Sequence, residues 1–175
     1  KGAVRSGQPV KVLGTGEVSV LDMAAAYSTF ANEGTRIDPR VITRIERADG
    51  TVLEQFEATR TEVLTVDQAA KVTHALAGVI DGGTGEQAQL PGRPAAGKTG
   101  TTQNNWDAWF AGYVPRLTTA VWMGYPDEAR PMDSVHGETV QGGNFPSRIW
   151  QRFMSAVLEG EPVDELPDPG DLDEG

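Results

Sequence analysis

The predicted fold depends on the stretch Ala95-Ala96-Gly97-Lys98-Thr99-Gly100-Thr101-Thr102, a small and polar segment. Two further segments follow it, an aromatic one from Asp107 to Val114 and an apolar one from Leu117 to Tyr125. Only Pro115 and Arg116 link the last two. So short a link implies antiparallel pairing, because parallel strands need a long crossover connection. Together the three segments predict an antiparallel sheet.

Three amphipathic helices are predicted around this sheet, over Ser19 to Asn32, Val66 to Ile80 and Pro146 to Leu158. Ser19 with Asp22, and Thr65 with Gln68, have the form of capping boxes, which satisfy backbone donors of the first turn. Pro146 stands in the first turn of the last helix, where its missing N–H costs nothing. The apolar stripe of this helix is predicted to lie on the sheet, and it consists of Ile149, Trp150, Phe153, Met154, Val157 and Leu158.

Two short strands are predicted between the first two helices, over 41–45 and 52–56. The Asp49-Gly50 pair between them accepts the positive φ angles of a tight turn, which predicts a β-hairpin. Residues 82–94 are rich in glycine and proline and are predicted to form a loop. The fold class is therefore α/β, an antiparallel sheet flanked by helices.

The length and charge of the chain limit what it can be. Its 175 residues suit one domain or part of a larger one. The formal charge is −10, and residues 161–175 hold seven acidic and no basic residues. We expect residues 1–160 to fold and residues 161–175 to be an acidic, Pro-containing disordered tail. The acidity argues against a nucleic-acid partner, which would need a concentrated basic face.

Several classes of site and targeting signal are missing from the sequence. There is no cysteine, so disulfides, thiolate nucleophiles and Cys-based zinc sites are excluded. No apolar run approaches the roughly 18 residues of a membrane span. The N-terminus, Lys1-Gly2-Ala3-Val4-Arg5, has neither an initiator Met nor an apolar signal segment. We therefore expect the chain to be a piece of a longer protein.

Residues 92–99 satisfy the phosphate-loop pattern G-x-x-x-x-G-K-[ST]. Such a loop needs a hydrophobic strand before it and a helix after it, whose N-terminal amides hold the phosphates. The preceding segment is rich in glycine, and aromatic strand residues follow, so neither element is predicted. Pro94 also removes one of the amides that the loop would use. The match is accidental on this interpretation, and a P-loop NTPase is the weakest alternative.

The same residues contain Lys98-Thr99-Gly100, the K-T-G signature of penicillin-binding proteins and β-lactamases. The motif lies in a wider frame, which consists of Ala95 to Thr102, Asp107 to Tyr113, Val121 to Tyr125, Leu13 to Tyr27 and Gly82-Gly83-Thr84-Gly85. This frame resembles the C-terminal half of the transpeptidase domain of class A, bifunctional penicillin-binding proteins. The resemblance covers nearly all of residues 10–158. It implies a β-lactamase-like or transpeptidase-like fold that is incomplete, with the upstream helical half absent.

The resemblance implies a role for each residue of the motif. Lys98 would help to hold the substrate carboxylate and support proton transfer around a serine. The backbone N–H of Thr101 would be an oxyanion-hole donor. Thr99, Gly100, Thr101 and Thr102 would form the substrate-binding strand, with the hydroxyls of Thr99 and Thr101 on one side of it. No metal and no cofactor are expected.

The resemblance also implies what must lie outside this chain. No S-x-x-K and no S-x-N occurs in the sequence, so the nucleophile, its lysine and the middle motif would belong to the upstream half. This chain alone is expected to be inactive. The implied reaction is acyl transfer from a D-Ala-D-Ala stem peptide, which cross-links peptidoglycan, and β-lactams would acylate the same serine. The protein is expected to be extracytoplasmic, tethered to the membrane by a segment that is not in this sequence.

Two alternatives remain open beside the NTPase: a D,D-carboxypeptidase and a non-catalytic penicillin-binding-like scaffold. Among further candidate residues, Asp107 either braces the motif strand or binds a loop amide. His74 and His136 are interpreted as structural or solvent-exposed. The loop 127–143 is long and polar, which is typical of a cleft rim or lid.

Overall fold

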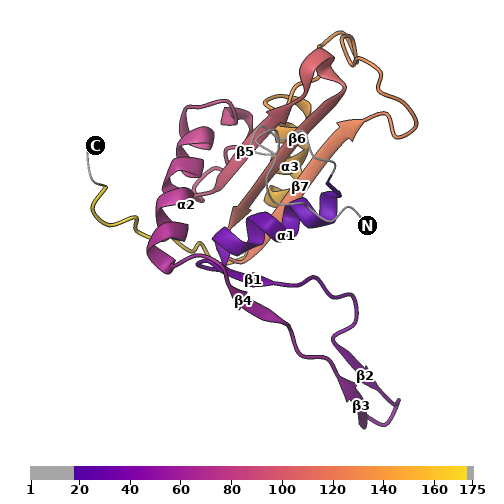
Figure 1. Cartoon of the computed structure of the whole chain (residues 1–175), viewed down its shortest axis with the longest axis vertical. Helices are drawn as coiled ribbons and strands as arrows, with labels where there is room; N and C mark the ends of the chain where they lie inside the picture. The colour runs from indigo at the N-terminus through magenta and orange to yellow at the C-terminus, as the bar shows by residue number, and fades with distance from the viewer. Residues whose placement is uncertain (1–17, 173–175) are drawn as a thin grey trace, which may run out of the picture.

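The computed structural model describes residues 18–172 and has the predicted α/β architecture (Figure 1). The helices are α1 (Val20–Ala31), α2 (Val66–Asp81) and α3 (Phe145–Val157), with short 3-10 helices η2 (Glu86–Ala88) and η3 (Gln103–Asn105). The strands are β1 (Thr35–Ile37), β2 (Arg44–Glu46), β3 (Val52–Gln55), β4 (Arg60–Glu62), β5 (Ala96–Thr101), β6 (Asp107–Val114) and β7 (Leu117–Gly124). Part of the family-like stretch that begins at Leu13 lies outside the described residues, as do the last three residues of the predicted tail.

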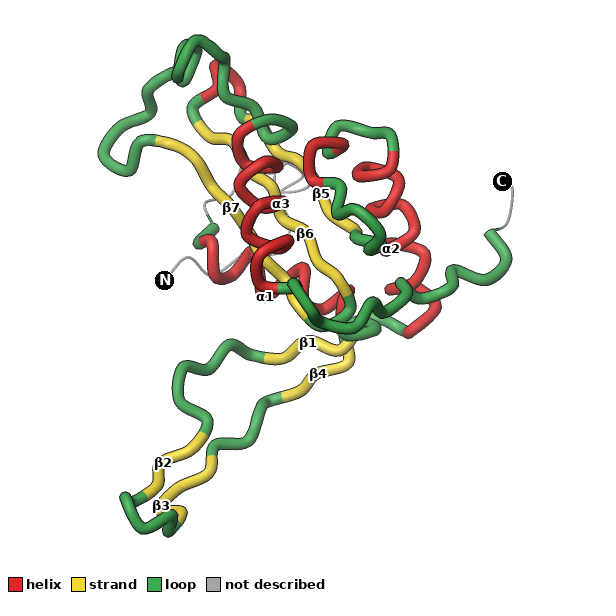
Figure 2. The backbone as a smooth tube through the Cα atoms, turned by 180° about the vertical axis from the view of Figure 1, so that it is seen from behind, coloured by secondary structure: helices red, strands yellow, loops and turns green. Residues whose placement is uncertain are grey.

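The three segments around the K-T-G motif form one antiparallel sheet in the order β5-β6-β7, as predicted. Figures 1 and 2 show α1 in front of the sheet and α3 behind it, with α2 beside β5. Among the described strands, none pairs with the outer edge of β5 or of β7. Within the described residues, helices therefore cover both faces of the sheet, and the outer edges of β5 and β7 have no paired strand.

The face toward α3 is organised by Trp150, which is completely buried. Its ring packs edge-on against Phe110, with ring centroids 5.2 Å apart. Its indole N–H donates to the carbonyls of Gly112 and Thr119 at 3.2 and 3.1 Å, so the side chain contacts both β6 and β7. One residue thus fixes the position of α3 on the sheet.

The prediction that the apolar stripe of α3 lies on the sheet is confirmed for Trp150, Met154 and Leu158, which belong to or pack against the core, and is wrong for the other three residues. Trp150 and Met154 are fully buried, whereas Ile149, Phe153 and Val157 are 44 to 46 % exposed. The buried positions 146, 147, 150 and 154 follow one narrow row of the helix. The reason is that the three-stranded sheet is wide enough to cover only that row of the helix, so the apolar side chains beside the row remain exposed.

The opposite face of the sheet is fixed by Tyr113, which is also completely buried. Its hydroxyl shares a hydrogen bond of 2.8 Å with the hydroxyl of Thr73 on α2. Burial raises the pKa of Tyr113 to about 12, because the phenolate would lose its hydration there. The neutral side chain therefore joins α2 to the sheet.

The stability of the folded chain is expected to fall as the pH rises from about 10 to about 12. The usual tyrosine pKa is 10.0, and the folded value for Tyr113 is about 12. The unfolded chain therefore loses this proton first, and stability that is complete below pH 10 is lost as the pH passes the folded pKa. Urea titrations at pH 8 to 12 measure the effect. A Tyr113→Phe variant that shows the same decline would contradict the assignment to Tyr113.

The capping box of α2 is confirmed, whereas at α1 only the bond to the Ser19 hydroxyl is formed. The hairpin is also confirmed, with its first strand at Arg44–Glu46 rather than 41–45. The Ser19 hydroxyl accepts from the Asp22 N–H at 3.1 Å, and Thr65 and Gln68 cap α2 reciprocally. The β2–β3 hairpin turns at Gly50, whose φ of 85° fits the expected tight turn.

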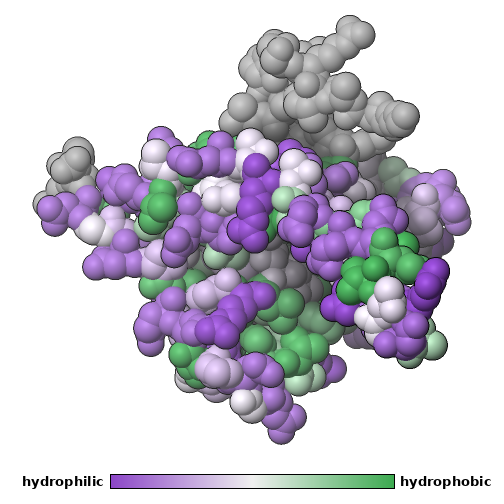
Figure 3. Space-filling model, turned by 90° about the horizontal axis from the view of Figure 1, so that it is seen from below, coloured by the Kyte–Doolittle hydropathy of each residue, from purple (hydrophilic) through white to green (hydrophobic). Residues whose placement is uncertain are grey.

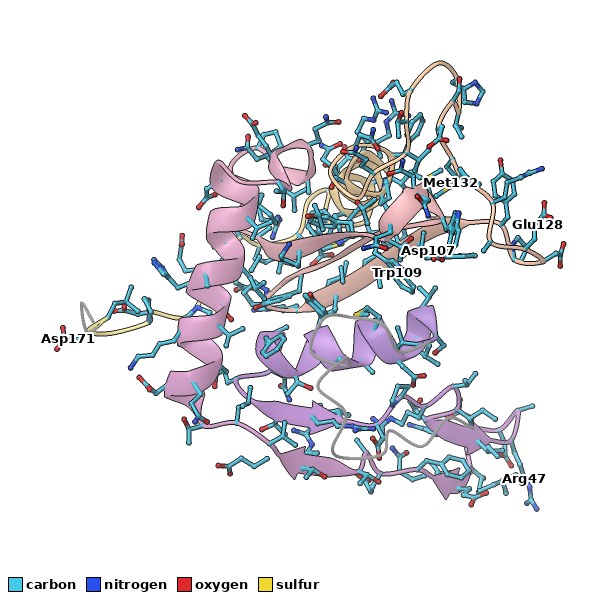
Figure 4. All side chains as sticks on the ribbon, turned by 45° about the horizontal axis from the view of Figure 1, so that its top comes forward. Arg47, Asp107, Trp109, Glu128, Met132 and Asp171 are labelled. Atoms are coloured by element: carbon cyan, nitrogen blue, oxygen red, sulfur yellow. The ribbon has the colours of Figure 1, made fainter. Side chains whose placement is uncertain are left out.

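Residues 35–62 extend away from the body as a narrow arm (Figure 1). The arm consists of the β1–β4 pair at its root and the β2–β3 pair at its end. Val41 on the arm is 99 % exposed, and Ile42 and Leu53 are also exposed. Figure 3, which looks at the molecule from below, shows a group of green apolar residues on the right, where the arm ends. Arg47 lies at the far end of the arm (Figure 4).

The segment after α3 runs back along the body without regular secondary structure. The Arg93 guanidinium donates to the carbonyls of Pro162 and Glu161 at 2.6 and 2.7 Å. Arg116 forms an ion pair with Asp164 at 2.6 Å. Two arginines from the body thus bind the first part of the acidic segment.

Candidate functional site

The K-T-G motif lies on β5, which is an edge strand of the sheet. The N–H of Thr102 donates to the Asp107 carbonyl at 3.0 Å. Alternation in an antiparallel ladder then directs the N–H groups of Lys98 and Gly100 toward β6 as well. The N–H groups of Thr99 and Thr101 point to the outer edge instead. This edge is therefore a row of backbone donors and acceptors that no described strand uses.

The hydroxyls of Thr99 and Thr101 lie on the same face of the strand, as predicted. Thr99 pairs with Phe110 and Thr101 with Ala108, residues on the α3 side of β6. The Thr101 hydroxyl accepts the N–H of Gly142 at 3.0 Å. The Thr99 hydroxyl shares a hydrogen bond of 2.7 Å with the hydroxyl of Thr84. Both hydroxyls are thus held by segments distant in the sequence.

Lys98 projects from the other face of β5, where it pairs with Ala111. Its side chain is exposed, and its ammonium donates to the carbonyl of Thr99 at 3.1 Å. That carbonyl points to the outer edge of the strand, so the ammonium lies at this edge too. A positive charge and the free N–H of Thr101 therefore occur along one edge.

The other two motif residues have different surroundings. Gly100 shares the Lys98 face, where an added Cβ would come within 3.3 Å of the Trp109 Cβ. The Thr102 hydroxyl accepts the Asp107 N–H at 2.8 Å, so the side chain of Thr102 stabilises the connection between β5 and β6. The structure therefore does not bring Thr102 to the outer edge with Thr99 and Thr101.

Asp107 braces the sheet at the end of the motif. Its carboxylate accepts the indole N–H of Trp122 at 2.8 Å. Trp122 and Trp109 form a tilted aromatic pair with ring centroids 6.3 Å apart. Figure 4 shows Asp107 and Trp109 together on the sheet, with Met132 of the following loop close by. Of the two interpretations of Asp107, the structure favours the brace.

The loop between β7 and α3 supports the motif strand, a role that the sequence analysis missed. Met132 and Val140 of this loop are buried, whereas Glu128 lies at its outer end (Figure 4). At Gly142 an added Cβ would lie 2.4 Å from the Trp109 carbonyl and 2.6 Å from the Gly100 carbonyl. The Gly142 carbonyl accepts the buried Ser147 hydroxyl at 2.6 Å. The loop therefore rests directly on the backbone of β5 and β6, and the pair Gly142-Gly143 was the available signal.

A Gly142→Ala substitution is expected to destabilise the fold by about 1–3 kcal/mol, because the new methyl group would overlap main-chain atoms that cannot rotate away. The loop would have to lift from β5, and the bond from Gly142 to Thr101 would lengthen. Gly78→Ala is the matched control, since nothing lies within 4 Å of a Cβ there and the position is helical. That change should stabilise by roughly 0.5–1 kcal/mol. Thermal melts of both variants measure the effects, and a stabilised Gly142→Ala would refute the close contact.

The phosphate-loop interpretation does not fit the structure. The chain continues through Lys98 and Thr99 as a strand, so no helix N-terminus follows that could hold a phosphate. Within residues 18–172, no group of three acidic or histidine side chains is arranged to hold a metal ion. In the same range, no helix is long and apolar enough to cross a membrane.

Residues 7–132 match the family described as "Penicillin binding protein transpeptidase domain". Penicillin-binding protein 1A of Mycolicibacterium smegmatis is 36 % identical over 170 residues, which are 92 % of this chain and 21 % of that protein. Penicillin-binding protein 1A/1B of Bacillus subtilis is 34 % identical and is covered to 18 %. The chain thus spans about a fifth of the length of the curated relatives that it matches.

Solved structures give the same result. The PonA1 protein of Mycobacterium tuberculosis in complex with penicillin V superposes with a TM-score of 0.83 and 34 % identity. The match covers 93 % of this chain and 44 % of that one. The D,D-transpeptidase domain of an Eggerthella lenta peptidoglycan glycosyltransferase superposes with a TM-score of 0.66 at 25 % identity, covering 89 % of this chain and 36 % of that one.

Proposed function

This chain belongs to the penicillin-binding protein transpeptidase family, as the C-terminal part of that domain in a class A protein, and we propose from this that it forms one wall of a serine D,D-transpeptidase site. The other wall, with the nucleophilic serine and its lysine, would come from the upstream half of the domain. The neighbour in complex with penicillin V supports a site that accepts β-lactams. The whole protein would act in peptidoglycan synthesis outside the cytoplasmic membrane.

The proposed reaction is an acyl transfer in two steps. The serine oxygen attacks the carbonyl carbon between the two D-alanines of a stem peptide. The C–N bond breaks, and the terminal D-alanine leaves with the proton on its amine. The amine of a neighbouring peptide then attacks the ester carbonyl, so that a new amide bond forms and the serine regains its proton.

The open edge of β5 is the observation that carries this proposal. A peptide or β-lactam lying along the edge would meet the free N–H of Thr101, which polarises the carbonyl as negative charge develops on its oxygen. The Lys98 ammonium and the hydroxyls of Thr99 and Thr101 would hold the carboxylate of the ligand. Thr102 and Gly100 would shape the strand rather than bind the ligand.

The test uses the full-length protein with a D-Ala-D-Ala pentapeptide and an amine acceptor, and mass spectrometry of the products. A cross-linked peptide is expected, with release of one D-alanine for each bond formed. Tetrapeptide as the only product would replace the proposal with a D,D-carboxypeptidase. If neither product forms and a fluorescent penicillin does not label the protein, the proposal would be replaced by a non-catalytic scaffold.

A further inference from the structure

Thr84 belongs to the Gly82-Gly83-Thr84-Gly85 loop between α2 and η2, and the proposed reaction gives this loop no task. The loop folds tightly over the end of α2. The N–H of Gly85 donates to the Val79 carbonyl at 2.9 Å, and an added Cβ at Gly83 would lie 2.8 Å from the Val79 Cα. A side chain at Gly83 would therefore collide with the backbone of α2, and one at Gly85 would press on Phe110 at 3.0 Å, so the backbone around Thr84 is closely packed.

Thr84 is held from two sides. A Cβ added to Gly143 would lie 2.5 Å from the Thr84 carbonyl oxygen. The loop before α3 therefore packs directly against the backbone of Thr84. Its hydroxyl reaches across to β5 and lies 2.7 Å from the Thr99 hydroxyl. Thr84 is exposed and Thr99 is half-buried.

The protons of these two hydroxyls can be assigned once a ligand carboxylate is considered. A carboxylate only accepts hydrogen bonds, so the Thr99 hydroxyl must donate its single proton to it. The Thr84–Thr99 bond can then persist only with Thr84 as the donor. A hydroxyl that accepts one bond while it donates another is polarised and donates more strongly.

Thr101 shows the same arrangement with a main-chain donor. Its hydroxyl accepts from the Gly142 N–H, which has no acceptor capacity, so the Thr101 proton is free to point to a ligand. The hydroxyls of Thr99 and Thr101 would thus each accept one hydrogen bond from the protein and donate one to the ligand. One accepted bond comes from a backbone amide and the other from a side chain.

We propose that Thr84 is a positioning residue, which donates to the Thr99 hydroxyl and thereby directs the Thr99 proton to the carboxylate of the ligand. This inference rests on the proposed function. It predicts that the loss of the Thr84 hydroxyl weakens the reaction only with ligands that carry a carboxylate. A residue that merely maintained the fold would affect all ligands alike.

The experiment measures second-order acylation constants of the full-length protein for penicillin V and for its methyl ester, which lacks the carboxylate. In Thr84→Val the constant for penicillin V should fall roughly three- to tenfold, as for one lost hydrogen bond, and the constant for the ester by less than about twofold. Thr84→Ser should restore the preference for the acid. Thr61→Val, on the arm, is the matched control and should change neither constant.

Equal losses with both ligands, or no loss with penicillin V, would overturn the inference. Lys98→Ala is measured in the same series, so that a failure of the role of Thr84 can be distinguished from a failure of the proposed function. If Lys98→Ala loses acylation and Thr84→Val does not, only the role of Thr84 fails. If neither variant loses acylation, the proposed function fails as well.

Discussion

Lys98→Ala in the full-length protein is expected to slow acylation by a labelled penicillin by roughly 100-fold or more. The Lys98 ammonium lies at the open edge of β5, 3.1 Å from the Thr99 carbonyl, beside the N–H groups that would receive the ligand. Its removal would take away the charged group that this chain offers to the ligand carboxylate, and the serine would keep only the lysine of the upstream half beside it. Fluorescence on a gel, followed over time, gives the rate.

Two controls define the cause of that loss. Lys98→Arg keeps the charge but replaces a compact ammonium with a planar guanidinium, and it should recover only part of the rate. Lys71→Ala removes a lysine of α2 that pairs with Asp67 on the same helix at 3.3 Å, and it should leave the rate unchanged. An unchanged rate in Lys98→Ala would refute the assignment of the β5 edge as the ligand site.

Trp150→Ala is expected to destabilise the transpeptidase domain by about 3–5 kcal/mol. The fully buried indole packs on Phe110 and donates to carbonyls of two strands. Alanine would leave a cavity between α3 and the sheet and two carbonyls without this donor. Urea denaturation of the full-length protein, followed by tryptophan fluorescence and circular dichroism, measures the loss.

Phe153→Ala is the matched control, because Phe153 is an aromatic residue of the same helix but is 46 % exposed. We expect it to cost less than about 1 kcal/mol. Trp150→Phe should lie between the two, since the ring remains while the N–H donor is lost. Equal effects of Trp150→Ala and Phe153→Ala would contradict the described packing of α3.

The sheet and the helices could be predicted because their signals are local. The two-residue link at Pro115-Arg116 set the direction of β6 and β7, and β6 has the predicted bounds of Asp107 and Val114. The capping boxes placed the starts of α1 and α2 at the expected residues. Each of these signals involves residues that are close in the sequence, so no knowledge of packing was needed.

The support of the motif could not be predicted, because it depends on contacts between distant segments. Thr84 and Thr99 are 15 residues apart, and Gly142 and Thr101 are 41 apart. The composition of the 127–143 loop indicated a surface rim, whereas its last residues rest on the sheet. The partial exposure of the α3 stripe has the same origin, since the width of the covering sheet is a property of the assembled fold.

Within residues 18–172, β5 and β7 each have one border with which no strand pairs, and this has a consequence for handling the protein. A border with free amides and carbonyls is a template for strand addition by another copy, which is the first step of ordered aggregation. The glycines and the charged lysine of β5 oppose such growth, whereas β7 carries apolar and aromatic side chains. Self-association of this chain should therefore begin at β7, and an added lysine there would improve its solubility.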